Sequence, residues 1–321
     1  MTSSASLANA WRLPRDFALI TVAVEAVIVG VRFGRQLWSG SEDSGYGLEV
    51  WLGMAANLAM AWVLSAALAW SHARQALEVR GAARLAQLRG PRVRLAGAYL
   101  IVRVFEYFVL SPWLYGLELL YMPGGRLVQL AMLVLGVWLA SWFALKGAKA
   151  SAASSFDAVD AGDADAAAPA GAWSGRATVA LLIAAVFASV QVWCVMAVDP
   201  WDEVERTLNR VVPFLGFLGP PLLLFALAFW GAWLGIGAGP VPARLRPFRA
   251  VAASVLALVL VVASCAALFF VGLALVLVPS SSSMAGIGGL IVLVGVLVVL
   301  YLVLTVLLTR FVTRRLYRPY L

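Results

Sequence analysis

The stretch AYLIVRVFEYFVL, residues 98–110, has the composition of a membrane-spanning helix, yet it carries Arg103 and Glu106 near its centre. A helix crosses the apolar core of a bilayer in about 20 residues, and charged side chains within such a segment are rare because they are costly. The stretch therefore indicates a helical membrane protein in which one helix has a polar side.

The composition of the whole chain agrees with this interpretation. Of its 321 residues, 63% are hydrophobic and 12% are charged, whereas soluble domains contain about 25% charged residues. The formal net charge is +8, but the basic residues are divided among short segments between apolar blocks, as in the inner loops of membrane proteins. We therefore expect no nucleic-acid partner. Arg greatly outnumbers Lys and the apolar residues are mainly Ala, Val, Leu and Gly, which favours a bacterial origin.

Eight apolar segments are each long enough to cross a bilayer. Because a spanning segment must satisfy its own backbone hydrogen bonds, each is predicted to be an α-helix. The segments are 17–37, 50–70, 95–116, 127–146, 177–198, 211–236, 249–278 and 285–311. The expected fold class is an all-α integral membrane protein with about eight transmembrane helices in a four-plus-four arrangement and both termini cytoplasmic.

The distribution of basic residues favours this orientation. With the N-terminus inside, four of the 24 Lys and Arg residues fall in outer loops, two lie within spans and the rest face the cytoplasm, as the positive-inside rule requires. The outer four are Arg35, Arg126, Arg206 and Arg210, and the two within spans are Arg32 and Arg103. The expected location is therefore the bacterial cytoplasmic (inner) membrane, as a multi-pass protein.

The chain divides into two halves around a segment of different composition. Residues 148–175 are rich in Ala, Ser, Asp and Gly and contain almost no large apolar side chain, so we expect a disordered, low-complexity cytoplasmic linker. The expected units are a first four-helix half over 1–147 and a second over 176–321. The halves are either a parallel repeat or two different four-helix units.

The charges in the third span have a counterpart in the first. Arg103 lies nine residues beyond Arg94, which marks the inner edge of the span, and this places it near mid-bilayer, at the depth of Glu25. A charge at that depth costs about 2.5–3.5 kcal/mol or more, so these side chains are expected to face inward and to bring spans one and three together. Glu25 with Arg103 is the favoured pair, and Arg103 with Glu106 is the local alternative on one helix face.

Other polar side chains of the first half can extend this group. They are Arg32 in span one, Asn57 in span two, and Tyr99 and Tyr107 in span three. The candidate site is an intramembrane polar cluster without an assigned catalytic residue. Its members are Glu25, Arg32, Asn57, Arg103 and Glu106.

Two interpretations of the cluster remain open. Buried carboxylates beside a cation can titrate during transport, so the cluster can line a path for protons, ions or a small solute. Alternatively, it is an ion pair that fixes the register of two helices. The first makes the protein a small-solute, ion or proton-coupled transporter, and the second fits a non-catalytic membrane subunit or scaffold of a larger complex. A membrane enzyme acting on a lipid is the third alternative.

Motifs for other chemistry are missing. The only histidine is His72, which cannot by itself supply bis-histidine haem ligation or a zinc site. There is no P-loop or HExxH motif, and the two cysteines form no CxxC pair. We therefore expect no cofactor and no metal, and we favour a non-enzymatic role over an enzymatic one; we interpret His72 as an ordinary interfacial residue.

The inner loop over 72–94 suggests a contact with lipid. It has a helical pattern with several arginines on one side, so it can lie on the anionic inner leaflet. The alternative is a basic loop that extends span two. Expected partners are membrane lipids, and either a protein partner or a second copy of this chain.

Small residues and prolines mark two further places in the second half. Pro213, Pro220 and Pro221 interrupt the start of span six, which indicates either a broken helix at a transport site or kinks of the kind that membrane helices tolerate. Gly288 and Gly295 in span eight permit close packing against a neighbouring helix.

Overall fold

The computed structural model describes eight stretches of the chain. They are residues 3–38, 48–80, 90–117, 125–146, 168–196, 213–237, 246–277 and 283–317. Within them the chain is almost entirely helical and contains no strand, as the apolar segments predict.

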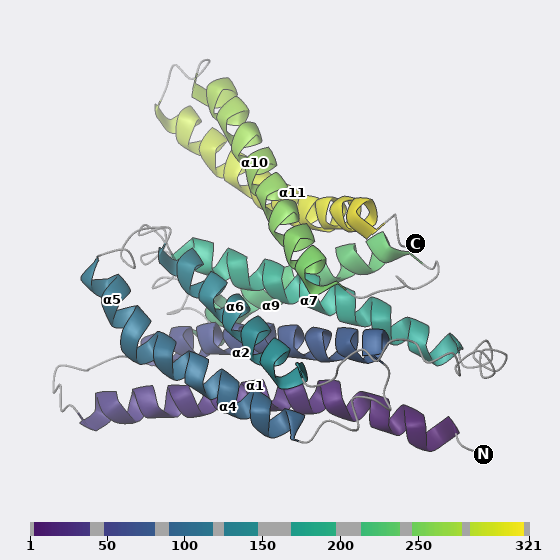
Figure 1. Ribbon diagram of the computed structural model, residues 1–321. Helices are drawn as coiled ribbons and strands as arrows, with labels where there is room; N and C mark the ends of the chain where they lie inside the picture. The colour runs from purple at the N-terminus through teal and green to yellow at the C-terminus, as the bar shows by residue number, and fades with distance from the viewer. Residues whose placement is uncertain are drawn as a thin grey trace.

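Each predicted span coincides with a helical segment, although the helices of spans one, two and five extend well beyond their predicted bounds (Figure 1). The helices of the first half are α1 (Ser3–Trp38), α2 (Leu48–Arg80), α4 (Pro91–Phe105) and α6 (Gly125–Leu145). A π-helical turn (Glu106–Leu110) and α5 (Ser111–Gly116) continue α4. Those of the second half are α7 (Ala168–Met196), α9 (Pro213–Ile236), α10 (Pro247–Leu277) and α11 (Ser283–Tyr317).

Five helices within the described ranges are long and apolar enough to cross a membrane. Their apolar segments are Val128–Leu145, Gly175–Val192, Gly219–Ile236, Pro247–Leu275 and Gly288–Tyr317. These helices have the character expected of an integral membrane protein. The count of eight spans stays a prediction.

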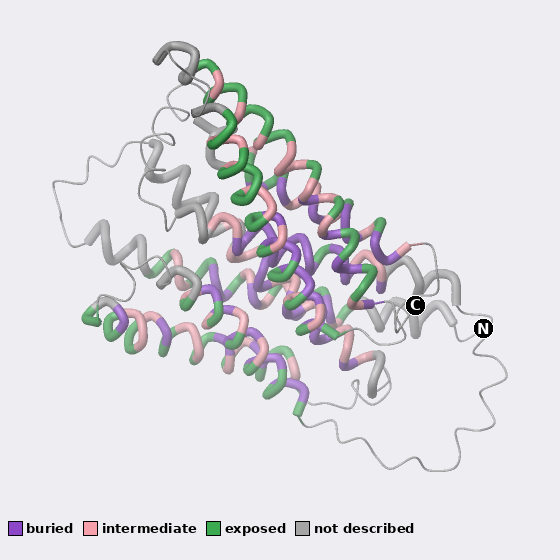
Figure 2. Tube along the Cα trace, turned by 90° about the horizontal axis from the view of Figure 1, so that it is seen from above, coloured by how far each residue is buried: buried purple, intermediate pink, exposed green. Residues whose placement is uncertain are grey.

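The two halves share one core. α2 packs against α7, and across this contact the indole nitrogen of Trp70 donates a hydrogen bond of 3.3 Å to the hydroxyl of Thr178. Buried apolar residues continue from α1 and α2 through α7 to α10, and Figure 2 shows the buried segments gathered at the centre of the molecule. The halves therefore form one helical assembly rather than two separate bundles.

α9 and α11 approach each other closely at two glycines. A Cβ atom on Gly231 would lie 2.6 Å from the backbone oxygen of Val306, and one on Gly235 would lie 2.7 Å from that of Arg310. Gly288 and Gly295, at which the sequence permits close packing, have no described atom within 4 Å of such a Cβ. The close contact thus uses a different pair of glycines, on the sixth predicted span.

The start of span six is a continuous helix. α9 runs from Pro213 to Ile236 and includes Pro220 and Pro221. Of the two alternatives from the sequence, a broken helix is therefore wrong, and the prolines are tolerated within the helix as in other membrane helices.

α10 and α11 form a long hairpin whose outer part leaves the core (Figure 1). Large apolar side chains are exposed along it, among them Phe270 and Ile291, each 67% exposed. Figure 2 shows the same outer part as mainly exposed. An apolar surface of this extent suits contact with lipid tails.

The connecting segments are described in part. α2 continues to Arg80, so the first part of the predicted 72–94 loop extends the second span, and residues 81–89 lie outside the described residues. Gly90, with φ of 68°, adopts a left-handed conformation directly before Pro91 begins α4, a position that suits glycine. Of the predicted linker, 148–167 also lies outside the described residues, and 168–175 belongs to α7.

The glycine contact predicts a position-specific effect of alanine. In Gly235→Ala the new methyl group must displace the α11 backbone, and overpacking of this kind costs about 1–3 kcal/mol. We expect the variant to unfold at a lower temperature than the unmodified protein in the same detergent. Gly295→Ala adds the same methyl group to open space, so it should leave the unfolding temperature unchanged or raise it. Equal unfolding temperatures for the two variants would contradict the close contact.

Candidate functional site

α1 and α4 run parallel, in register, along one side of the assembly. At the end where both helices begin to pack together, Arg92 Nη2 lies 2.6 Å from Asp16 Oδ2. Farther along the same two helices, Glu25 contacts Tyr99 and Arg103. Two successive polar contacts thus fix the axial position of α1 relative to α4.

The central contact is a two-pronged ion pair between Glu25 and Arg103. The Nε atom of Arg103 lies 2.7 Å from Oε1 of Glu25, and its Nη2 atom donates a hydrogen bond of 2.9 Å to Oε2. The hydroxyl of Tyr99 also donates to Oε1. Glu25 is 1% exposed and Tyr99 is fully buried, so this carboxylate is satisfied by the protein and shielded from solvent.

Glu106 forms the second arm of the cluster. The Nη1 atom of Arg103 donates a hydrogen bond to Oε2 of Glu106, which is the one hydrogen bond that the Glu106 carboxylate receives among the described residues. Its side chain is 12% exposed, against 2% for Glu25. One guanidinium therefore serves two carboxylates, and the group carries a net negative charge when all three are ionised.

The backbone changes from α-helix to π-helix at Glu106. The turn covers Glu106–Leu110, and it is closed by a bond from the amide of Ser111 to the carbonyl of Glu106. Pro112 follows directly; it has no amide hydrogen to donate to Phe108, and proline rings crowd the preceding turn of a helix. Wide turns of this kind are rare and occur often at functional sites.

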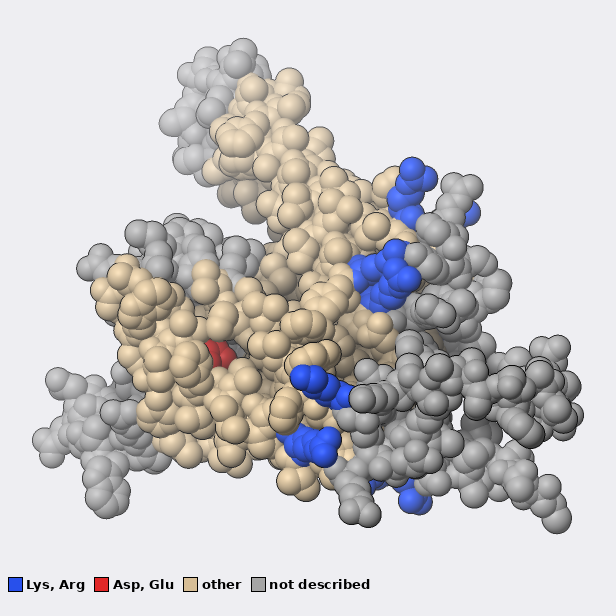
Figure 3. All heavy atoms as spheres, viewed as in Figure 1, with Lys and Arg blue, Asp and Glu red and all other residues tan. Residues whose placement is uncertain are grey.

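The buried stripe of α4 differs sharply from its other side. Leu95, Tyr99 and Glu106 are buried, whereas Ile101 and Phe105 on other faces are 70% and 54% exposed. Figure 3 shows a small acidic area surrounded by uncharged surface on this side of the molecule. Charge is thus concentrated in a narrow strip between α1 and α4, where the low local dielectric strengthens each contact.

The structure places the sequence-predicted residues as follows. Both pairs that the sequence offered as alternatives are present together, since Arg103 contacts Glu25 and Glu106 at once. Tyr99 joins the cluster, and Tyr107 packs edge-on against Phe108 with ring centroids 4.9 Å apart. Arg32 and Asn57 belong to α1 and α2, but their side chains lie outside the described part of the chain.

Two features of the site are not evident in the sequence pattern. One is the choice of Tyr99, because the sequence offers both Tyr99 and Tyr107 as extensions of the cluster and the span contains a third tyrosine, Tyr115. The other is the π-helical turn, for which Pro112 is the available signal. Spacing alone cannot distinguish a widened turn from a regular helix, because both keep the same residues in order.

Removing the shared cation should strongly destabilise the fold. Arg103→Met keeps an unbranched apolar stem but leaves Glu25 and Glu106 buried without their cation, and loss of one partner from a buried ion pair costs about 3–5 kcal/mol. Glu106→Gln leaves the Glu25–Arg103 pair intact and should cost about 1 kcal/mol, the value of one hydrogen bond. Unfolding in mixed micelles of increasing SDS content measures both. A smaller loss for Arg103→Met than for Glu106→Gln would contradict the assigned pairing.

Comparison with known proteins gives no relative from which a role for these residues can be taken. No protein-family model, no curated protein and no solved structure matches this chain. The cluster is therefore interpreted from its own geometry.

Proposed function

We propose that this protein is a proton-coupled transporter of the bacterial cytoplasmic membrane, in which Glu106 takes up and releases the proton. The observation that carries the proposal is the charge imbalance of the cluster, in which two carboxylates share the guanidinium of Arg103. A carboxylate in an apolar environment without its own cation binds a proton readily, since the neutral form avoids the cost of desolvation.

The two carboxylates have different roles in this proposal. Glu25 receives two contacts from Arg103 and one from Tyr99, and it is almost fully buried. Glu106 has one contact, is less buried and begins the π-helical turn. Glu25 therefore holds Arg103 in place, and Glu106 changes its protonation state. When Glu106 is neutral, Arg103 stays paired with Glu25, so the cluster remains charge-balanced in that state.

The competing function is a membrane subunit in which the cluster only fixes the register of α1 and α4. A register device needs one ion pair, and Glu25 with Arg103 already provides it. The additional carboxylate favours the transporter, because a purely structural role gives no reason to place a second acid beside one cation in the membrane interior.

The deciding experiment measures protonation and proton movement in the same preparations. In proteoliposomes that contain a pH-sensitive dye, a potassium diffusion potential should drive proton entry through the unmodified protein and not through Glu106→Gln. Infrared difference spectra between acid and alkaline buffer should contain the C=O bands of all carboxylic acids that titrate, and Glu106→Gln should lose the one component that belongs to Glu106.

Asp16→Asn is the matched control. It also removes one carboxylate, but from a site at the end of the helix pair where Asp16 contacts Arg92 and Arg15. It should keep both the proton flux and the infrared component that belongs to Glu106. If Glu106→Gln folds normally and conducts protons as the unmodified protein does, the proposal is wrong and the cluster is structural.

The proposed orientation has its own test. We expect eight crossings with both termini in the cytoplasm, which is favoured by the basic inner loops of the sequence. Fusions of a periplasm-active phosphatase should be active after residue 43 and after residue 203, and inactive after residue 160 and at the C-terminus. A fluorescent protein that folds only in the cytoplasm should give the opposite pattern. Phosphatase activity at residue 160 would contradict the four-plus-four topology.

A further inference from the structure

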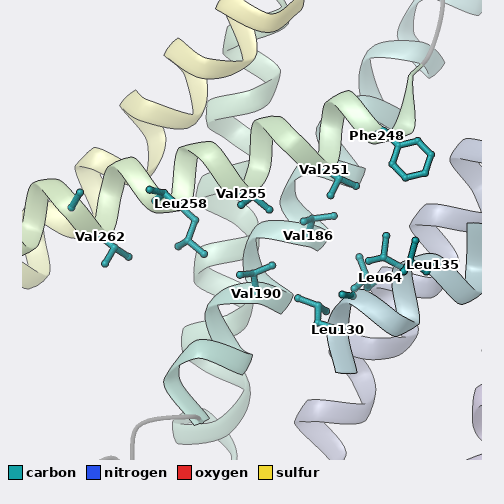
Figure 4. Close-up of a pocket in the computed structure, with 14 residues that line it drawn as sticks. Leu64, Leu130, Leu135, Val186, Val190, Phe248, Val251, Val255, Leu258 and Val262 are labelled. Carbon is teal, nitrogen blue, oxygen red and sulfur yellow. The ribbon is translucent and has the colours of Figure 1, made fainter. Parts of the chain in front are cut away.

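An apolar groove lies between α10 and α6, with α7 and α2 as its floor (Figure 4). Its volume is about 770 Å³ and all 14 of its lining residues are apolar. Figure 4 shows Val255 and Leu258 of α10 on one side and Leu130 of α6 on the other. The volume falls in the range of about 300–1,000 Å³ that is usual for ligand pockets.

A smaller polar chamber adjoins one end of the groove. It has a volume of about 220 Å³ and is lined in part by His72, Gln75 and Ser141. Phe248 lines the groove and lies between the two spaces. Its ring packs edge-on against two residues that line the chamber, with centroid distances of 6.0 Å to His72 and 5.7 Å to Trp138. His72, interpreted from the sequence as an ordinary interfacial residue, is thus 9% exposed and forms a wall of this chamber.

The hydroxyl of Ser141 indicates that the chamber receives a polar group. Ser141 is 1% exposed, and its Oγ atom has no hydrogen-bond partner among the described residues. Buried hydroxyls are nearly always hydrogen-bonded, since leaving one unpaired costs free energy. A ligand oxygen in the chamber would supply the missing partner.

The charges at this end of the groove favour an anionic ligand. The Lys146 ammonium lies 4.8 Å from the ring centroid of Trp142, which lines the chamber. Among the described residues, no acidic side chain lines either space. Figure 3 shows basic side chains gathered at the end of the described surface where α1 begins and α11 finishes.

We propose that the groove and chamber together bind one anionic phospholipid, with an acyl chain along α10 and the phosphate-bearing headgroup at the chamber. From Phe248 to Val262 the helix rises about 21 Å at 1.5 Å per residue, which is enough for a chain that spans one leaflet, about 15 Å of hydrocarbon core. An entirely apolar groove that ends near an unpaired hydroxyl and the ammonium of Lys146 matches a molecule with one apolar and one anionic end. The inference is independent of the proton-transport proposal, because it uses none of the residues of the Glu25–Arg103–Glu106 cluster.

The test is a lipid titration of the full chain in detergent, read by native mass spectrometry and by thermal unfolding. The probes are phosphatidylglycerol, phosphatidylcholine and inorganic phosphate. We expect one phosphatidylglycerol to bind saturably and to raise the unfolding temperature, while phosphatidylcholine binds more weakly and inorganic phosphate gives no comparable stabilisation. Equal binding of the two lipids would contradict a site that selects an anionic headgroup. Full stabilisation by inorganic phosphate would show that the chamber binds a free anion and not a lipid.

Two neighbouring positions of α10 provide a matched pair of variants. Val255→Trp fills the groove, whereas Leu256→Trp adds the same ring at a position that is 45% exposed and does not line it. We expect Val255→Trp to lose the bound phosphatidylglycerol and Leu256→Trp to retain it. Equal retention by both variants would show that the groove is not the binding site.

Three further variants keep the result interpretable. If Val255→Trp does not fold, Val134→Trp blocks the groove from α6, with Leu139→Trp as its exposed control on the same helix. Ser141→Ala should weaken phosphatidylglycerol binding about fivefold, the effect of losing one hydrogen bond, without lowering the unfolding temperature of the lipid-free protein. If Ser141→Ala binds phosphatidylglycerol with unchanged affinity, the headgroup does not bind in the chamber and that part of the proposal is wrong.

Discussion

The position of α4 depends on a single guanidinium held between two carboxylates in an apolar setting. Each of the three charges would be costly if it faced lipid alone, and the arrangement accommodates all three because Arg103 lies against Glu25 and Glu106 together. The pair of Arg103 with Glu25 requires α1 and α4 to be adjacent at this depth, and the second contact between Asp16 and Arg92 fixes their parallel direction. The neighbouring contact of α4 with α6 is close as well, because a Cβ atom on Gly136 would lie 2.9 Å from the Cγ1 atom of Val102.

Depth along the span is what made this contact predictable from the sequence. Spans one and three are expected to enter from the same side, so counting residues from their basic inner ends compares Glu25 with Arg103 directly. The same count cannot choose between Glu25 and Glu106 as the partner of Arg103, since both are within reach. The structure resolves this ambiguity by using both, and the widened turn after Phe105 lies where Glu106 makes its contact.

Small residues illustrate why other contacts were not predictable. Gly231 and Gly235 are four residues apart on α9, and Gly288 and Gly295 are seven apart on α11, so both pairs lie along one face of a helix. Among the described residues, the first pair meets a neighbouring backbone and the second does not. The apolar sequence of the surrounding spans is nearly uniform, and it does not specify which face of a helix meets protein and which meets lipid. For the same reason Ser141, a single hydroxyl in an apolar helix, gives no signal until α2 and α10 are placed beside it.

The charged cluster and the apolar groove lie on different sets of helices. The acid–base cluster belongs to α1 and α4, whereas the groove is formed by α2, α6, α7 and α10. α2 is common to both regions, because it packs on α1 and supplies Leu64 to the groove and His72 to the chamber. α6 is a second connection, because it packs closely on α4 and lines both the groove and the chamber. Since tightly packed interiors transmit displacement, α2 and α6 are the helices through which a movement of α1 or α4 would reach the groove.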